Sequence, residues 1–270
     1  MEHGTTKLAV ETEALTRRFA TVTAVDHLNL AVPASSIFGL LGPNGAGKTT
    51  TIKMLITMLP PSAGVARVAG YDVQRQPVEV RRAIGYVSQM LSADGALTGY
   101  ENLLLFARIY AIPRRERRDR VFDALEFMGL SEAAHLLVKN YSGGMIRRLE
   151  IAQSMMHRPA VLFLDEPTIG LDPVARRAVW AHLRELLSRF GTTILMTTHD
   201  MEEAEEMCEY VAIMHRGRAV ATGSPEALRA SVGPQASLDD VFVHFVGGLI
   251  DEGGSYRESA RIRRTARRLG

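Results

Sequence analysis

Near the N-terminus, eight consecutive residues have the types and spacing of a phosphate-binding loop. Residues 42–49 read Gly-Pro-Asn-Gly-Ala-Gly-Lys-Thr, which fits the pattern G-x-x-x-x-G-K-[ST] at every position. Glycines let backbone N–H groups approach phosphate oxygens because no Cβ stands in the way. We expect Lys48 to reach the β- and γ-phosphates of a nucleoside triphosphate and the Thr49 hydroxyl to bind Mg²⁺.

The surroundings of this loop decide whether the match has meaning. A short apolar run, 37–41, precedes it and reads as a strand, and 49–59 reads as a helix whose N-terminus would point at the phosphates. The alternative, a glycine-rich turn that fits by chance, is disfavoured by this strand–loop–helix context. The expected nucleotide-binding residues of this segment are Gly42, Asn44, Gly45, Ala46, Gly47, Lys48, Thr49 and Thr50.

A pair of acids follows a second apolar run. Val161–Leu164 reads as a buried parallel strand and leads directly into Asp165 and Glu166. The carboxyl end of such a strand is where α/β sheets bind ligands. We expect Asp165 to hold Mg²⁺ and Glu166 to act as the general base for an attacking water. Helix capping or a solvated surface would explain the dipeptide alone, but phosphoryl transfer needs such groups beside a phosphate loop.

A third segment, Tyr141-Ser142-Gly143-Gly144-Met145, opens a helical stretch between the two nucleotide motifs. A serine hydroxyl and two glycine amides at a helix N-terminus form an anion site. The segment resembles the L-S-G-G-Q signature of ABC transporter ATPases, with Tyr141 in place of leucine and Met145 in place of glutamine. In that family the signature of one subunit contacts the ATP bound by the other, so the resemblance implies a head-to-tail dimer, with a homodimer sufficient.

Further residues match the family pattern in order. Gln89 matches the glutamine that contacts the metal and the attacking water, and Asp172 ends the Ile169–Asp172 segment that resembles the D-loop. His199 matches the switch histidine at the γ-phosphate, and Phe19 lies where the family stacks an aromatic ring on adenine. The resemblance, which covers most of 8–246, implies ATP and Mg²⁺ as cofactors. It implies catalytic roles for Glu166, His199 and Gln89, metal binding by Thr49, Gln89 and Asp165, and nucleotide contacts from Phe19, Asp172, Ser142, Gly143 and Gly144.

Alternating strands and helices predict an α/β fold: a P-loop NTPase core with a mainly parallel sheet, a helical lobe and a small antiparallel β part near the N-terminus. We expect the core to comprise 1–90 and 160–225 and the helical lobe 91–159. A C-terminal extension, 226–270, would end in a basic tail rich in arginine between 257 and 268. That tail is more typical of a solvated segment than of an element lying on an anionic membrane.

Composition limits the partners. The net charge is +2 and there is one cysteine, Cys208, so neither a nucleic-acid-binding surface nor an internal disulfide is expected. No apolar run reaches the roughly 18 residues of a membrane span, and no secretory signal is evident at the N-terminus. We therefore expect that the chain does not itself cross a membrane, and the resemblance to ABC transporter ATPases implies a peripheral protein at the cytoplasmic face, bound to integral membrane permease subunits. The segment after Gln89 has more apolar residues than one core face needs, and we expect part of it to form a groove for a short helix of those subunits. Its apolar residues include Leu91, Leu97, Tyr100, Leu104, Phe106 and Tyr110.

The predicted function is that of an ATP-hydrolysing subunit that powers transport. The Tyr-Ser-Gly-Gly-Met form and Ser237–Phe242 resemble the daunorubicin-type, drug-resistance exporter branch, which implies export of a drug, a lipid or another hydrophobic compound. One alternative is a non-transport ABC ATPase acting on DNA or ribosomes, but the chain has neither a long coiled-coil insertion nor a second ATPase half. The other is a module that binds ATP without hydrolysis, against which Glu166 and His199 argue.

Overall fold

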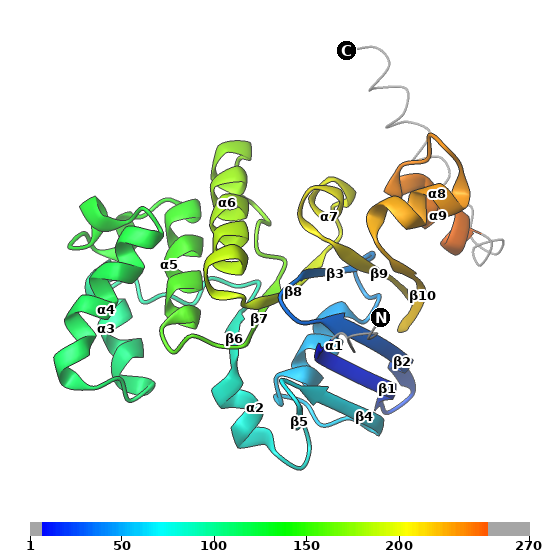
Figure 1. Ribbon diagram of the computed structural model, residues 1–270, viewed down its shortest axis with the longest axis horizontal. Helices are drawn as coiled ribbons and strands as arrows, with labels where there is room; N and C mark the ends of the chain where they lie inside the picture. The colour runs from blue at the N-terminus through cyan, green and yellow to red at the C-terminus, as the bar shows by residue number, and fades with distance from the viewer. Residues whose placement is uncertain (1–6, 248–270) are drawn as a thin grey trace, which may run out of the picture.

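The computed structural model describes residues 7–247, and its centre is a six-stranded, mainly parallel sheet (Figure 1). The spatial order is β10-β9-β3-β8-β7-β6. All pairs are parallel except β9 with β10. The strands are β3 (Ile37–Leu41), β6 (Ile84–Val87), β7 (Val161–Asp165), β8 (Thr193–Thr198), β9 (Tyr210–His215) and β10 (Arg218–Gly223).

A second, antiparallel sheet is built mostly from the N-terminal segment and has the order β2-β1-β4-β5. Its long strands alternate between buried and exposed side chains along much of their length, as half-buried strands do. Its strands are β1 (Leu8–Phe19), β2 (Val22–Pro33), β4 (Ala63–Val68) and β5 (Tyr71–Asp72). The α/β class, with a mainly parallel sheet and an antiparallel part near the N-terminus, is therefore confirmed.

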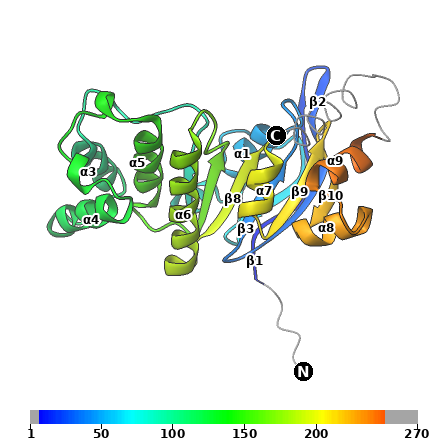
Figure 2. The same cartoon turned by 90° about the horizontal axis from the view of Figure 1, so that it is seen from above.

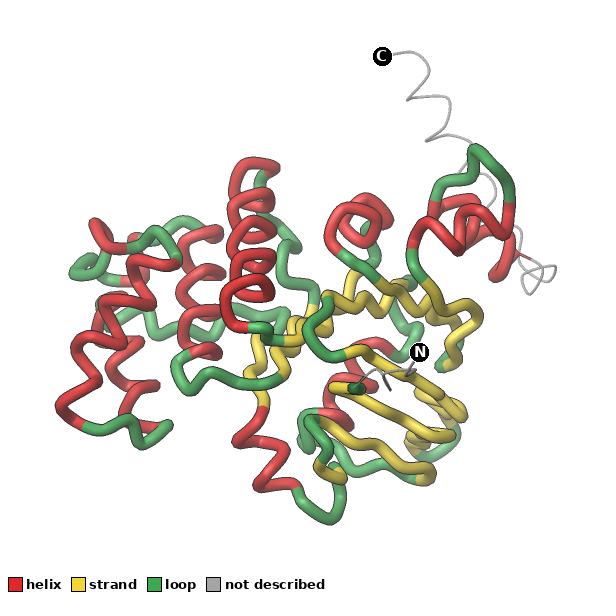
Figure 3. The backbone as a smooth tube through the Cα atoms, viewed as in Figure 1, coloured by secondary structure: helices red, strands yellow, loops and turns green. Residues whose placement is uncertain are grey.

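Helices surround the parallel sheet and form a group at one end of the molecule, where α3, α4 and α5 lie together (Figures 1 and 3). The helices are α1 (Lys48–Leu55), α2 (Pro77–Ala83), α3 (Gly99–Ile109), α4 (Arg114–Phe127), α5 (Gly143–Met155), α6 (Pro173–Phe190), α7 (Met201–Met207), α8 (Pro225–Val232) and α9 (Leu238–Gly247). Two short 3₁₀ turns, Ser131–Ala133 and Val138–Asn140, lie between α4 and α5.

The core lies on both faces of the parallel sheet. Along β7, Leu162 and Leu164 pack into the cluster that includes α6 and α7, whereas Val161 and Phe163 pack into the cluster that includes α1. Figure 2 shows α6 and α7 over one face of the sheet, with α1 on the other. Because both faces are covered, the strand has no polar alternation, which explains its continuous apolar sequence.

The C-terminal part of the described chain packs on the core through α9. Its apolar face is buried at Leu238, Val241, Phe242 and Val246, and the backbone N–H of Leu238 donates to Glu205 Oε1 at 2.9 Å. The arginine-rich tail predicted between 257 and 268 lies outside the described residues. Among residues 7–247, no helix combines the length and apolar character needed to cross a bilayer.

Candidate functional site

The phosphate loop connects the end of β3 to the start of α1, as the sequence predicts. Gly47, the residue before the helix, has φ +102°, and a Cβ there would lie 2.5 Å from the Ala24 carbonyl oxygen. A side chain at this position would therefore push the loop away from β2. No side chain caps the N-terminus of α1, so the amides of its first turn are available to an anion.

Lys48 lies almost buried inside the loop. Its Nζ donates to the Gly42 carbonyl oxygen at 2.8 Å and to that of Pro43 at 3.2 Å, and lies 3.6 Å from Glu166 Oε1. Burial lowers the pKa of the lysine below its usual value, while the carboxylates of Glu166 and Asp165 oppose this shift. The ammonium group of Lys48 is thus directed at the acid pair.

Asp165 lies at the end of β7 and is held by two hydroxyl groups. Thr49 Oγ1 donates to its Oδ1 at 3.1 Å, and Thr197 Oγ1 donates to the same oxygen at 2.6 Å. Thr49 and Asp165 are thereby brought together from positions 116 residues apart. Thr197, on β8, is a residue of the site that the sequence analysis does not identify.

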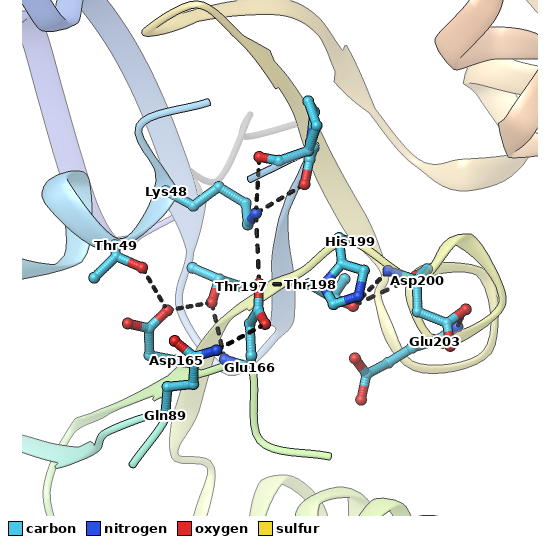
Figure 4. A network of polar contacts seen from close by, with 12 residues as sticks. Lys48, Thr49, Gln89, Asp165, Glu166, Thr197, Thr198, His199, Asp200 and Glu203 are labelled. Carbon is cyan, nitrogen blue, oxygen red and sulfur yellow. Dashed lines mark hydrogen bonds and ion pairs between the residues drawn. The ribbon is translucent and has the colours of Figure 1, made fainter. Parts of the chain in front are cut away.

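Glu166 is the point on which the other predicted catalytic side chains converge (Figure 4). Gln89 Nε2 donates to its Oε2 at 3.4 Å, and His199 Nδ1 lies 3.2 Å from its Oε1. The Glu166 side chain is only 9% exposed, whereas that of His199 is 48% exposed. Glu166 also has φ +49°, a left-handed conformation that costs a non-glycine residue about 1–3 kcal/mol and persists only where its surroundings enforce it.

His199 is positioned by the start of α7. Asp200 caps this helix by accepting the backbone N–H groups of Glu202 and Glu203, and its other carboxylate oxygen pairs with Arg176 at 3.0 Å. The buried Glu203 carboxylate accepts from Thr168 Oγ1 at 2.6 Å and from Trp180 Nε1 at 3.0 Å. The helix after His199 is therefore tied both to α6 and to the segment that follows Glu166.

The signature segment lies at the start of α5. The Ser142 hydroxyl accepts the backbone N–H of Met145 at 3.3 Å, and Ser142 and Gly143 are exposed. A Cβ on Gly144 would lie 2.7 Å from the Ala175 Cβ, so glycine permits the close approach of α5 to α6. Tyr141, the departure from the family leucine, is buried in the helical lobe, where its hydroxyl donates to the Ala133 carbonyl oxygen at 2.6 Å.

Within one chain, the signature does not join the phosphate loop. In Figures 1 and 2, α5 and α1 stand apart, with α6 between them. Among residues 7–247, no recorded hydrogen bond or ion pair links Ser142 to Lys48 or Glu166. The structure thus brings together Lys48, Thr49, Gln89, Asp165, Glu166 and His199. It leaves Ser142 and Gly143 exposed elsewhere, with Gly144 buried against α6.

Phe19 and Asp172, the two remaining predicted nucleotide-contact residues, are both exposed. Phe19 ends β1 and is 42% exposed, and the Arg17 guanidinium lies 4.5 Å from the centroid of its ring. Asp172 is the N-cap of α6, where its carboxylate accepts the N–H groups of Val174 and Ala175 at 2.9 Å each. An exposed ring and an exposed cap leave both residues accessible to a ligand or another chain.

The oxygen donors at the site have the chemistry expected for Mg²⁺. Thr49 Oγ1, at the start of α1, lies 3.1 Å from Asp165 Oδ1, at the end of β7. Gln89 is hydrogen-bonded to Glu166, the residue after Asp165. No group of three or more His, Cys, Asp or Glu side chains in the described part of the chain could hold a metal ion by itself. Mg²⁺ commonly uses one or two carboxylates and completes its octahedron with phosphates and waters, so the residues fit this ion.

Comparisons with known proteins agree with this geometry. A family model described as ABC transporter matches residues 25–169. The chain is 45% identical over 225 residues to the daunorubicin/doxorubicin resistance ATP-binding protein of Streptomyces peucetius, covering 83% of this chain and 68% of that protein. It is 44% identical over 223 residues to the Nod factor export ATP-binding protein I of Paraburkholderia xenovorans, covering 83% and 73%.

Solved structures give the same assignment. A structure described as the ATP binding subunit of an ABC transporter superposes with a TM-score of 0.78 at 29% identity, covering 89% of this chain and all of that one. A component of the cbiONQ ABC transporter complex from Clostridium perfringens gives 0.77 at 27% identity, covering 88% and 94%. The chain therefore belongs to the ABC transporter family, as an ATP-binding, ATP-hydrolysing subunit similar to those of the drug-resistance branch.

Proposed function

We propose that this chain powers export of a drug, a lipid or another hydrophobic compound through separate membrane subunits, with Glu166 as the general base. One observation supports the catalytic part: polar side-chain atoms of Gln89, His199 and Lys48 lie 3.4, 3.2 and 3.6 Å from the nearly buried Glu166 carboxylate. The relatives named for daunorubicin resistance and Nod factor export support an exporter.

Hydrolysis follows from this arrangement. The phosphate loop and the positive end of α1 hold the triphosphate, with Lys48 moving from Glu166 to the β- and γ-phosphates. Glu166 accepts a proton from the attacking water as the water oxygen bonds to the γ-phosphorus. The bond from that phosphorus to the β-γ bridging oxygen breaks, which releases ADP. His199 and Gln89 orient the γ-phosphate and the water.

Thr49, Asp165 and Gln89 would hold Mg²⁺, which when bound neutralises charge on the β- and γ-phosphate oxygens. Phe19 would stack on the adenine ring. These assignments are proposals that the accessible ring of Phe19 and the adjacent oxygens of Thr49 and Asp165 support.

A second copy would complete each site. Ser142, Gly143 and Gly144 lie at the start of α5, away from the chain's own phosphate loop, and Asp172 is an exposed helix cap; both features support a contact with another chain. We therefore propose a head-to-tail dimer in which the signature of each copy closes on the ATP held by the other. ATP binds the closed state more tightly than the open one, so binding closes the dimer and hydrolysis reopens it.

The contact with membrane subunits is proposed beside Gln89. Of the six apolar residues named for this segment, Leu91 is well exposed, at 52%, and Leu97 is half-buried. The other four, Tyr100, Leu104, Phe106 and Tyr110, are partly buried against the core. Our proposal therefore keeps Leu91 and adds three exposed apolar side chains of the Gln89 loop and α3: Met90, Leu105 and Ile109. A short helix of a membrane subunit bound here, at the cytoplasmic face, would sense Gln89 directly.

The substitution Glu166→Gln tests the catalytic proposal. It keeps the shape and most hydrogen bonds of the side chain but removes the base, so ATP affinity should stay near wild type while turnover falls by roughly 10²–10⁴. The ATP-bound dimer should then persist in size-exclusion chromatography with light scattering. Near-normal phosphate release by the variant would mean that another group takes the proton.

A further inference from the structure

Thr197 lies beside the acid pair because of strand register. In the parallel pairing of β7 with β8, Asp165 is directly opposite Thr197, so both side chains project from the same face of the sheet. Thr197 is fully buried. A buried hydroxyl needs hydrogen-bond partners, and within residues 7–247 the hydrogen-bond partners of this one are Asp165 and Glu166.

The Thr197 hydroxyl bonds to both acids at once, in two different ways. It accepts the backbone N–H of Glu166 at 2.9 Å and donates its proton to Asp165 Oδ1 at 2.6 Å (Figure 4). The first bond holds the main chain of the residue whose φ is +49°. The second fixes the carboxylate that also accepts from Thr49.

The neighbouring hydroxyl groups of β8 do not share this role. Thr198, the next residue, bonds to the main chain of Asp200. Thr193, at the opposite end of the strand, accepts the backbone N–H of Ser35 at 2.9 Å. Of the three threonines of β8, Thr197 alone couples the rotamer of the expected metal ligand to the backbone of the expected base.

We propose that Thr197 is a positioning residue for hydrolysis, which sets the Asp165 carboxylate toward the metal and the Glu166 backbone toward the water through one side-chain oxygen. Loss of that oxygen leaves the Glu166 N–H without its partner in a strained conformation and frees the Asp165 carboxylate to rotate. The inference rests on the proposed roles of Asp165 and Glu166 and adds the group that aligns them.

The test uses Thr197→Val, which has nearly the same shape without the hydroxyl, and Thr197→Ser, which keeps it. Thr193→Val is the matched control, because it removes a buried threonine hydroxyl from the same strand far from the acids. Mn²⁺ affinity of each protein with a non-hydrolysable ATP analogue is measured from the EPR signal of free Mn²⁺. Thermal unfolding and analogue binding in chelator establish that each variant folds.

We expect Thr197→Val to weaken Mn²⁺ binding about 10-fold or more and to lower turnover about 10- to 100-fold, since groups that orient metal ligands have effects of this size. Thr197→Ser and Thr193→Val should remain within about twofold of wild type. In chelator, the analogue affinity of Thr197→Val should be unchanged.

Three outcomes would overturn the inference: wild-type Mn²⁺ affinity in Thr197→Val, an equal loss in Thr193→Val, or a serine variant no better than valine. Asp165→Asn separates this failure from failure of the proposed function. If Asp165→Asn weakens Mn²⁺ binding and Thr197→Val does not, the role of Thr197 alone is refuted. If neither variant weakens Mn²⁺ binding, both the proposed metal role of Asp165 and the inference about Thr197 are refuted.

Discussion

Arg147 and Glu150, three residues apart on α5, form a buried ion pair at 3.1 Å that holds the chain on both sides of Gln89. The Arg147 guanidinium donates to the carbonyl oxygens of Ser88 at 2.7 Å and Gln89 at 3.0 Å. Glu150 Oε1 accepts from the backbone N–H and the hydroxyl of Ser92. The helix that begins with the signature residues is thus joined directly to the loop that carries Gln89.

This arrangement predicts a large effect of Glu150→Ala. Arg147 would remain buried without its carboxylate, so the free energy of unfolding should fall by roughly 3–5 kcal/mol in urea titrations. The matched control is Glu206→Ala, which breaks the half-exposed pair of Arg184 with Glu206 at 2.6 Å and should cost less than about 1 kcal/mol. Equal losses in the two variants would contradict the importance of burial.

Phe19 gives a prediction about nucleotide affinity. If its exposed ring stacks on adenine, Phe19→Ala should weaken ATP binding by about 1–3 kcal/mol, by analogy with other base–aromatic contacts. Fluorescence titration with an ATP analogue measures this change. Phe122→Ala is a suitable control because Phe122 is also exposed, at 38%, with an arginine, Arg118, 5.9 Å from its ring centroid. Unchanged affinity in Phe19→Ala would remove adenine stacking from its role.

The phosphate loop and the acid pair are predictable from sequence because each is a local pattern attached to a strand. Val161–Leu164 followed by Asp165 and Glu166 indicates both the strand and its functional end. Thr197 is different, because its contact with Asp165 depends on the pairing of two strands whose register no local pattern reveals. The same holds for Arg147, whose partners at Ser88 and Gln89 are about 60 residues away.

The length of one helix differs from the prediction, and the cause is local. The helix predicted over 49–59 ends at Leu55, because Thr57 adopts φ +65° and the N–H of Met58 bonds back to the Lys53 carbonyl oxygen. In α3, periodicity shows which residues share a face but not how far the neighbouring helices cover each face. Leu104 is partly buried against the core, whereas Leu105 and Ile109 are exposed.

Burial of His157 predicts a pH dependence of stability. Its ring stacks on Tyr110 with centroids 3.9 Å apart, and Nε2 lies 2.9 Å from the Ile84 carbonyl oxygen. Burial lowers the pKa of this histidine below 6.5, and the contact with Ile84 opposes the shift. As pH falls below 6.5, the unfolded chain takes up the proton first, so stability declines until the lower folded pKa is reached.

The substitution His157→Gln removes this titration while its amide can still donate to Ile84. Urea unfolding should therefore show a smaller loss of stability between about pH 7 and pH 5 than in the wild type. Some loss should persist, because burial also lowers the pKa of His182 and of His215. An identical pH slope in the variant and the wild type would show that His157 does not contribute.

The shared site between two copies gives the last prediction. Lys48→Ala should inactivate both sites of a homodimer by removing the phosphate-binding cation. Ser142→Arg should do the same, because it places bulk and charge where the partner's γ-phosphate must bind. As a control, Ser131→Arg introduces the same side chain at another exposed serine of the helical lobe and should leave ATP hydrolysis near wild type.

Mixing the two inactive variants then distinguishes the arrangements. Random pairing makes about half of the dimers mixed, and each mixed dimer has one doubly damaged site and one intact site, so roughly a quarter of all sites are whole. Phosphate release should return to about a quarter of the wild-type level, or to less than that if the two sites cooperate. If Lys48 and Ser142 acted on the same ATP within one chain, no mixture could restore a whole site. An absence of recovery, with subunit exchange verified by labelled protein, would refute the head-to-tail dimer.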